Sequence, residues 1–163
     1  LFALAVAREL NVSWGQLTKL KVDIPSGHHG CLNFRSITVI DETYNSSPEA
    51  VMAALNLLVS KNGRHFAVLG TMLELGEHSI HLHQKIAEYA AQLDLDGLII
   101  VSTGVEAIVM KLAASSIKNL YVVSSPEQAF PPLKALLKPG DVVLLKASRG
   151  IAMERLIPLL SAL

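Results

Sequence analysis

The sequence has few features that would hold a fold together covalently, and little charge of either sign. Its 163 residues include one cysteine, Cys31, so no disulfide can form within the chain. A lone cysteine fits a reducing compartment such as the cytoplasm. Charged residues make up 17% of the chain and the formal net charge is zero. A nucleic-acid-binding domain would show clustered Lys and Arg, so the composition argues against such a partner.

Several common functional motifs are also missing. No apolar run reaches the roughly 18 residues that cross a bilayer, and the apolar start has no basic residue before it, unlike a signal peptide. Neither the G-x-x-x-x-G-K-[ST] phosphate loop nor the G-x-G-x-x-G fingerprint occurs. His78, His81 and His83 cluster, but their spacing does not indicate a metal site, and we expect solvated or helix-capping histidines. The chain could therefore hold part of a nucleotide, but it lacks the usual means of activating one.

A regular alternation of apolar segments is present instead. Hydrophobic residues make up 51% of the chain, as in a globular domain. From residue 37 onward, short apolar runs rich in Val and Ile alternate with stretches of helical spacing. We expect strands at 37–41, 65–70, 97–102, 120–124 and 141–147, and helices at 48–61, 78–93, 104–115, 126–138 and 151–162. This order predicts right-handed βαβ crossovers and an α/β fold, in which helices cover both faces of a mostly parallel sheet.

Two of the expected helices have recognisable apolar faces. In 48–61, Val51, Leu55 and Leu58 fall at the i, i+4 and i+7 positions. In 78–93, a weaker stripe consists of Ile80, Ile86, Ala87 and Ala90.

The segment 23–36 is rich in Pro, Gly and Ser and differs from what surrounds it. It predicts a linker followed by an edge strand or a hairpin, with a domain boundary near residue 22. The first 22 residues form an amphipathic helical pattern, and we expect them to be the end of a preceding domain in a longer protein.

A polar cluster, "DETYNSS" (41–47), follows the first expected strand. Ligands of open parallel sheets bind outside the carboxyl ends of the strands, which is where this cluster falls. Ser47 could cap the next helix with Pro48 at its first position, or Ser46 could cap it with Glu49 closing a capping box. The cluster either binds a ligand or only ends a strand and begins a helix.

Two further strands are followed by polar loops. "LGTMLELGEHS" (69–79) surrounds Glu74, and "LLKASRG" (144–150) places Lys146, Ser148 and Arg149 at the expected carboxyl edge. A Lys and an Arg beside a Ser suit a carboxylate or phosphate, although a basic pair can also be merely solvated. Three such loops on one edge favour a binding site.

The three loops together resemble a known family. "DETYNSSPEAVMAAL", "VLGTMLELGEHSIHLH" and "LLKASRGIAMERL" are similar, in order and spacing, to motifs in the C-terminal part of the Mur ligases, and most of all to the MurF branch. That branch typically shows D-D-[ST]-Y-N-A-N-P, G-D-M-L-E-L-G with a later His, and K-G-S-R. The resemblance covers nearly the whole chain. Residues 1–22 resemble the last helix of the family's central ATPase domain, and 23–163 its C-terminal Rossmann-like domain.

The resemblance implies a cytoplasmic, monomeric enzyme of peptidoglycan synthesis. Such a ligase uses ATP and Mg²⁺ to phosphorylate the terminal carboxylate of UDP-N-acetylmuramoyl-tripeptide, and the amine of D-Ala-D-Ala then attacks the acyl phosphate. The phosphate loop and the magnesium ligands belong to the central domain. The C-terminal domain contributes adenine, ribose and dipeptide contacts, so the chain alone is expected to be inactive.

Matching positions imply roles for individual residues. The nucleotide side comprises Glu42, Tyr44, Asn45 and His28. The dipeptide side comprises Glu74, His83, Lys146, Ser148 and Arg149.

Four positions depart from the family's pattern. Glu42 replaces an Asp, His28 an Arg that reaches the ATP phosphates, Thr71 an Asp and Ala147 a Gly. These departures leave a non-catalytic Rossmann-like binding domain as one alternative. A second is a ligase of the same family for another amino acid, which the loops around Glu74 and Lys146 to Arg149 would decide.

Overall fold

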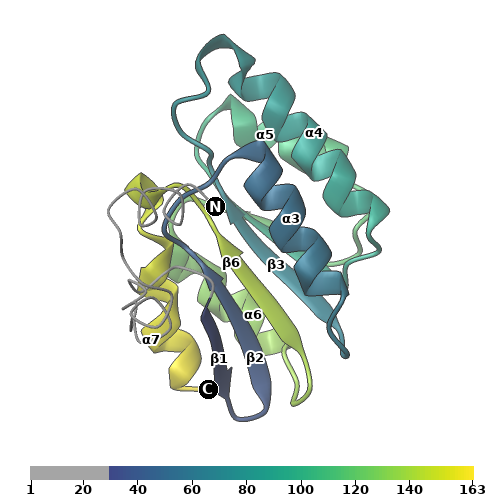
Figure 1. Cartoon of the computed structure of the whole chain (residues 1–163), viewed down its shortest axis with the longest axis vertical. Coiled ribbons are helices and arrows are strands. Elements are labelled where there is room, and N and C mark those ends of the chain that lie inside the picture. Colours follow the sequence, from purple (N-terminus) through teal and green to yellow (C-terminus); the bar gives the residue numbers. More distant parts are fainter. Residues whose placement is uncertain (1–29) are drawn as a thin grey trace, which may run out of the picture.

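The structure is a computed structural model and describes residues 30–163 (Figure 1). The helix predicted at 1–22, the boundary near residue 22 and His28 lie outside these residues. One six-stranded sheet has the strand order β1-β2-β6-β3-β4-β5. Strand β1 is antiparallel to β2, and the other neighbouring pairs are parallel. The predicted α/β fold with a mostly parallel sheet is confirmed.

The elements lie close to their predicted ranges. The strands are β1 Gly30–Phe34, β2 Ile37–Glu42, β3 His65–Gly70, β4 Gly97–Val101, β5 Leu120–Val123 and β6 Val142–Lys146. The helices are α3 Pro48–Val59, α4 Ser79–Gln92, α5 Val105–Ala113, α6 Phe130–Leu136 and α7 Leu156–Ser161. No helix in the described part of the chain is long and apolar enough to cross a bilayer.

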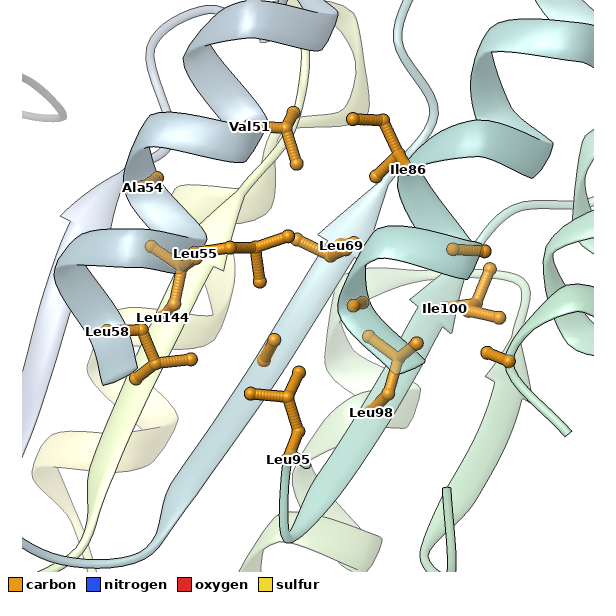
Figure 2. Close-up of a cluster of buried hydrophobic side chains, with 14 of the residues drawn as sticks. Val51, Ala54, Leu55, Leu58, Leu69, Ile86, Leu95, Leu98, Ile100 and Leu144 are labelled. Atoms are coloured by element: carbon orange, nitrogen blue, oxygen red, sulfur yellow. The ribbon is translucent and has the colours of Figure 1, made fainter. Parts of the chain in front are cut away.

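The sheet separates two hydrophobic cores. Helices α3, α4 and α5 cover one face, where the predicted stripe Val51, Leu55 and Leu58 is buried against Leu69 and Leu144 (Figure 2). Helices α6 and α7 cover the other face, and the residues buried there from these two helices are Leu133, Leu156 and Leu160. Side chains alternate between the two cores along each central strand, as a pleated strand buried on both faces requires.

Strands β1 and β2 form a hairpin at one edge of the sheet, in agreement with the prediction for 23–36. Arg35 and Ser36 make a two-residue turn, with φ of 47° and 66°. Positive φ at both positions is the type I′ geometry, whose twist matches that of the flanking strands.

Three helical predictions need correction. Ile80 is 46% exposed and does not belong to the buried stripe, whereas Ile86, Ala87 and Ala90 do. The segments predicted as helices at 126–138 and 151–162 begin as 3₁₀ turns, and their α-helical parts are short. In the first of them Pro131 and Pro132 follow the 3₁₀ turn, and a proline lacks the N–H that would extend an α-helical ladder through it.

Candidate functional site

The three polar loops meet at one edge of the sheet, as the sequence predicted. Lys146 at the end of β6 is in register with Glu42 of β2 on one side and with Leu69 of β3 on the other. The chain then leaves β6 toward α7 on one face, whereas β2 and β3 lead to helices on the opposite face. Such a divergence of neighbouring loops leaves a crevice at the carboxyl edge, which is the usual ligand site of open parallel sheets.

The first loop, 43–47, is shaped by local hydrogen bonds. Asp41 Oδ1 accepts bonds from the Thr43 N–H (3.2 Å) and the Thr43 hydroxyl (2.7 Å). Ser47 caps α3 by accepting a 3.3 Å bond from the Ala50 N–H, with Pro48 at the first helical position. The first of the two predicted caps is therefore the one formed. Tyr44 is 37% exposed, and Asn45 beside it is exposed as well.

Lys146 connects this loop to the middle of the sheet. Its side chain is 2% exposed, and its Nζ donates a 2.8 Å hydrogen bond to the Asn45 carbonyl. The Glu42 carboxylate lies 3.6 Å from the same Nζ. Burial lowers the pKa of Lys146 and outweighs the opposing effect of Glu42. Lys146, which the resemblance assigns to the dipeptide side, therefore points toward the first loop in this structure.

The second loop, 71–76, is held to the third by two hydrogen bonds. The Leu73 N–H donates to the Ser148 hydroxyl (2.9 Å), and the Ser148 N–H donates to the Thr71 carbonyl (3.3 Å). Ser148 is 4% exposed, so its hydroxyl is committed to loop geometry. Glu74 is exposed and has φ of 65°, an uncommon conformation for a residue with a Cβ.

His83 of α4 holds the second loop through a hydrogen bond to its backbone. Its Nε2 accepts a 2.9 Å bond from the Met72 N–H, and its Nδ1 lies 2.7 Å from the Ser79 carbonyl. These partners require a proton on Nδ1 and a free lone pair on Nε2, which is the neutral imidazole. The side chain is fully buried, so the expectation of a solvated or capping histidine is wrong. His83 cannot contact a substrate directly in this arrangement; it fixes the Met72 backbone.

Arg149 is the exposed cation of the third loop. Its guanidinium lies over the Tyr44 ring, 5.1 Å from the ring centroid. A cation at that distance is attracted by the ring's π electrons, and a guanidinium can still grip a carboxylate or phosphate in its own plane. The arrangement therefore joins an aromatic face to an anion-binding group at one surface.

A polar pocket of about 250 Å³ opens beside the second and third loops, at the carboxyl ends of β3, β4, β5 and β6. Its lining includes Thr71, Ser102, Thr103, Ser124, Ser125 and Arg155. Arg155 also pairs with Glu127 at 3.1 Å. Apart from Thr71, sequence reasoning missed these residues. A signal was present, since β4 and β5 are each followed by a pair of hydroxyl residues, "VST" and "VSS".

The predicted site residues therefore divide into two groups. Tyr44, Asn45, Glu74 and Arg149 lie at the surface of the edge, whereas Glu42, His83, Lys146 and Ser148 are buried and hold the loops. Among residues 30–163, no group of three or more His, Cys, Asp or Glu side chains could hold a metal ion.

Residues 31–149 match the family described as "Mur ligase, glutamate ligase domain". The chain belongs to the Mur ligase family. Among curated Mur ligases, the UDP-N-acetylmuramoyl-tripeptide–D-alanyl-D-alanine ligase of Synechocystis is 32% identical over 99% of the chain and 36% of its own length. The Mycobacterium tuberculosis (H37Rv) enzyme of the same name is 33% identical over 94% of the chain and 35% of its own length.

Solved Mur ligase structures agree with the sequence relatives. MurF from Thermotoga maritima in complex with ADP is 33% identical, with a TM-score of 0.73 over 98% of this chain and 36% of that one. MurF from Acinetobacter baumannii is 28% identical, with a TM-score of 0.85 over 99% of this chain and 36% of that one. The chain thus spans about a third of the length of the relatives that it matches.

Proposed function

We propose that this chain is the nucleotide- and dipeptide-binding part of a cytoplasmic, monomeric ligase that joins D-Ala-D-Ala to UDP-N-acetylmuramoyl-tripeptide in peptidoglycan synthesis. The observation that carries the proposal is the joining of three motif-bearing loops at one sheet edge. Lys146, Ser148 and Arg149 each contact a neighbouring loop there. The similarity to ligases of this name, one of them solved with ADP, supports the same function.

The reaction consumes ATP and forms an amide. The terminal carboxylate of the tripeptide attacks the γ-phosphorus of ATP, which releases ADP and leaves an acyl phosphate. The amine of D-Ala-D-Ala then attacks the acyl carbon, the C–O bond to phosphate breaks, and the amine loses a proton as inorganic phosphate leaves. By resemblance, the phosphates and Mg²⁺ are held by the family's central domain.

We assign the nucleoside contacts to the exposed side chains of the first loop. An aromatic side chain such as Tyr44 is suited to pack against a base, and the NH₂ group of the exposed Asn45 amide is suited to donate a hydrogen bond to it. Glu42 is 8% exposed and lies beside Lys146, so in this conformation its predicted ribose contact is less accessible than those of Tyr44 and Asn45.

We assign the dipeptide to the pocket beside the third loop. Arg155 in its lining is a cation suited to the dipeptide carboxylate, and Arg149 precedes the lining residue Gly150 in the sequence. The hydroxyls of Ser102, Thr103 and Ser124 suit the amide groups of the dipeptide. The volume of about 250 Å³ lies below the roughly 300–1,000 Å³ of pockets for drug-sized ligands, as expected for a ligand as small as a dipeptide.

Two of the substitutions that motivate the non-catalytic alternative leave the structure of the edge undisturbed. Ala147, which replaces the family's Gly, fits because Gly70 opposite it lacks a side chain. At position 71 the loop uses the backbone carbonyl, so a Thr in place of Asp leaves that bond intact. Two of the four departures are thus compatible with a well-formed edge.

The test is ADP release by the full-length protein with ATP and UDP-N-acetylmuramoyl-tripeptide, offering D-Ala-D-Ala, D-Glu or a diamino acid in turn. Turnover with D-Ala-D-Ala alone would support the proposal. Turnover with D-Glu or the diamino acid instead would show that the protein is a ligase of this family with a different substrate. No turnover with any of the three would favour the non-catalytic alternative.

A further inference from the structure

Lys146 is buried in a way that lysines rarely are. Its side chain is 2% exposed at the carboxyl end of a central strand, and lysine is almost never fully buried unless it is paired. Desolvating an ammonium is costly, and a buried ion pair seldom improves stability over an apolar pair of the same size. Stability alone therefore gives no reason for a charge at this position.

Its contacts lead to the first loop and not to the pocket. The Nζ atom donates to the Asn45 carbonyl at 2.8 Å, while the Glu42 carboxylate lies 3.6 Å away. Glu42 ends β2 and Asn45 follows it three residues later, so the ammonium bridges two points on the same side of the site. The bond to Asn45 spans 101 residues of sequence.

The other side-chain hydrogen bonds described for the loop are local. Asp41 bonds to Thr43, Asn45 to the Ser46 N–H, and Ser47 to Ala50. Such bonds fix the shape of a turn, but they do not fix where the turn lies relative to the rest of the sheet. The bond from Lys146 does, because it runs from the central strand β6 to the loop backbone between Tyr44 and Ser46.

The same stretch of chain also orients the other two parts of the site. Ser148 accepts a bond from Leu73 of the second loop, and Arg149 lies over the Tyr44 ring. Lys146 therefore belongs to a run of four residues that sets the relative positions of all three loops.

We propose that Lys146 is a positioning residue for nucleotide binding: its ammonium fixes the Asn45 carbonyl, and thereby the Tyr44 and Asn45 side chains, and it does not contact the dipeptide. This inference rests on the proposed function for the identity of the two ligands. The anchoring of the first loop by a buried cation does not depend on which ligands bind.

The first test is steady-state kinetics of the full-length ligase carrying Lys146→Met. Removing the anchor should raise KM for ATP by about tenfold, because a charge-assisted hydrogen bond to the loop is lost. KM for D-Ala-D-Ala should change by less than about twofold, since no direct contact is removed. A Lys85→Met variant, which removes an exposed lysine on α4, should change neither constant.

A second variant covers the case in which Lys146→Met does not fold. Lys146→Met leaves the Glu42 carboxylate buried without its cation, whereas Glu42→Gln/Lys146→Met removes both charges. Because Glu42 is itself a predicted ribose contact, the reference is Glu42→Gln alone, and the double variant should show a further selective rise in KM for ATP relative to it. A rise in KM for the dipeptide with KM for ATP unchanged would overturn the inference, and so would two unchanged constants in a folded variant.

Hydrogen exchange tests the anchoring role of Lys146 independently of the proposed ligase activity. In Glu42→Gln/Lys146→Met, backbone amides of residues 43–50 should exchange at least about fivefold faster, because local opening becomes easier. Amides of β3 should keep their protection. This readout needs no turnover, so it stands even if the ligase assignment fails, and unchanged exchange at 43–50 would refute the anchoring role.

Discussion

Gly70 and Ala147 approach so closely that only one of them can carry a side chain. A Cβ added to Gly70 would lie 2.6 Å from the Ala147 Cβ, and no real pair of such atoms comes that near. The Gly70→Ala variant should lose about 1–3 kcal/mol of unfolding free energy through overpacking. Urea unfolding, followed by circular dichroism, measures this loss.

A compensating variant provides the control for this contact. In an Ala147→Gly background the same Gly70→Ala change should cost clearly less, because the remaining neighbours of the added Cβ, Met153 Cε at 3.1 Å and Ile151 Cγ2 at 3.2 Å, lie farther away. Equal costs in the two backgrounds would show that the Gly70–Ala147 contact is not the origin of the destabilisation.

At the scale of elements, the beginnings of α4 and α5 are tied together by one carboxylate. The cap of α5 is Gly104, which offers no side chain to the first N–H groups of the helix. Glu106 supplies the acceptor instead: its carboxylate bonds its own N–H and accepts a 2.8 Å bond from the Ser79 hydroxyl of α4. Both bonds lower the pKa of Glu106, the backbone bond most.

This depressed pKa makes a pH-dependent contribution to stability. The contribution is fully present above the ordinary glutamate value of 4.5, and it is lost as the pH falls through the lower folded-state pKa. Replacing Glu106 by Gln should therefore flatten the fall in unfolding free energy as the pH is lowered from about 5. Urea midpoints across this range would show it, with the exposed Glu154→Gln as the matched control; parallel curves for Glu106→Gln and the unsubstituted chain would contradict the assignment.

The elements themselves were largely predictable, whereas the directions of the polar side chains were not. Apolar runs such as 65–70 and 97–101 are too continuous to be half-exposed strands, and their alternation with helices fixes a parallel sheet. The direction of Lys146 depends on its register with Glu42, more than a hundred residues away, and no local pattern carries that information. The burial of His83 is unpredictable for a similar reason, because its partner Met72 lies in the loop between β3 and α4 and not on its own helix.

At the scale of the whole molecule, the described part of the chain has what an independently folding unit needs. Two hydrophobic cores cover the two faces of one sheet, and residues 30–163 are long enough to bury a core of this kind. At the edge to which we assign a nucleoside and a dipeptide, by contrast, the usual phosphate-binding motif is missing, since the 163 residues contain no phosphate loop. The chain on its own should therefore fold but should not catalyse the ligase reaction.

The 163-residue chain should unfold cooperatively on heating and yet release no ADP or phosphate from ATP, whichever amino acid or dipeptide is offered. Adenosine and ATP should bind it with similar affinity, weaker than about 1 mM, since nucleoside contacts without a phosphate anchor are worth about 4 kcal/mol. Titration calorimetry with adenosine and with ATP measures the two affinities, and a coupled assay measures ADP release. Amide formation by the chain alone would refute the inference that catalysis needs the family's central domain. A clear preference for ATP over adenosine would reveal a phosphate site within these 163 residues.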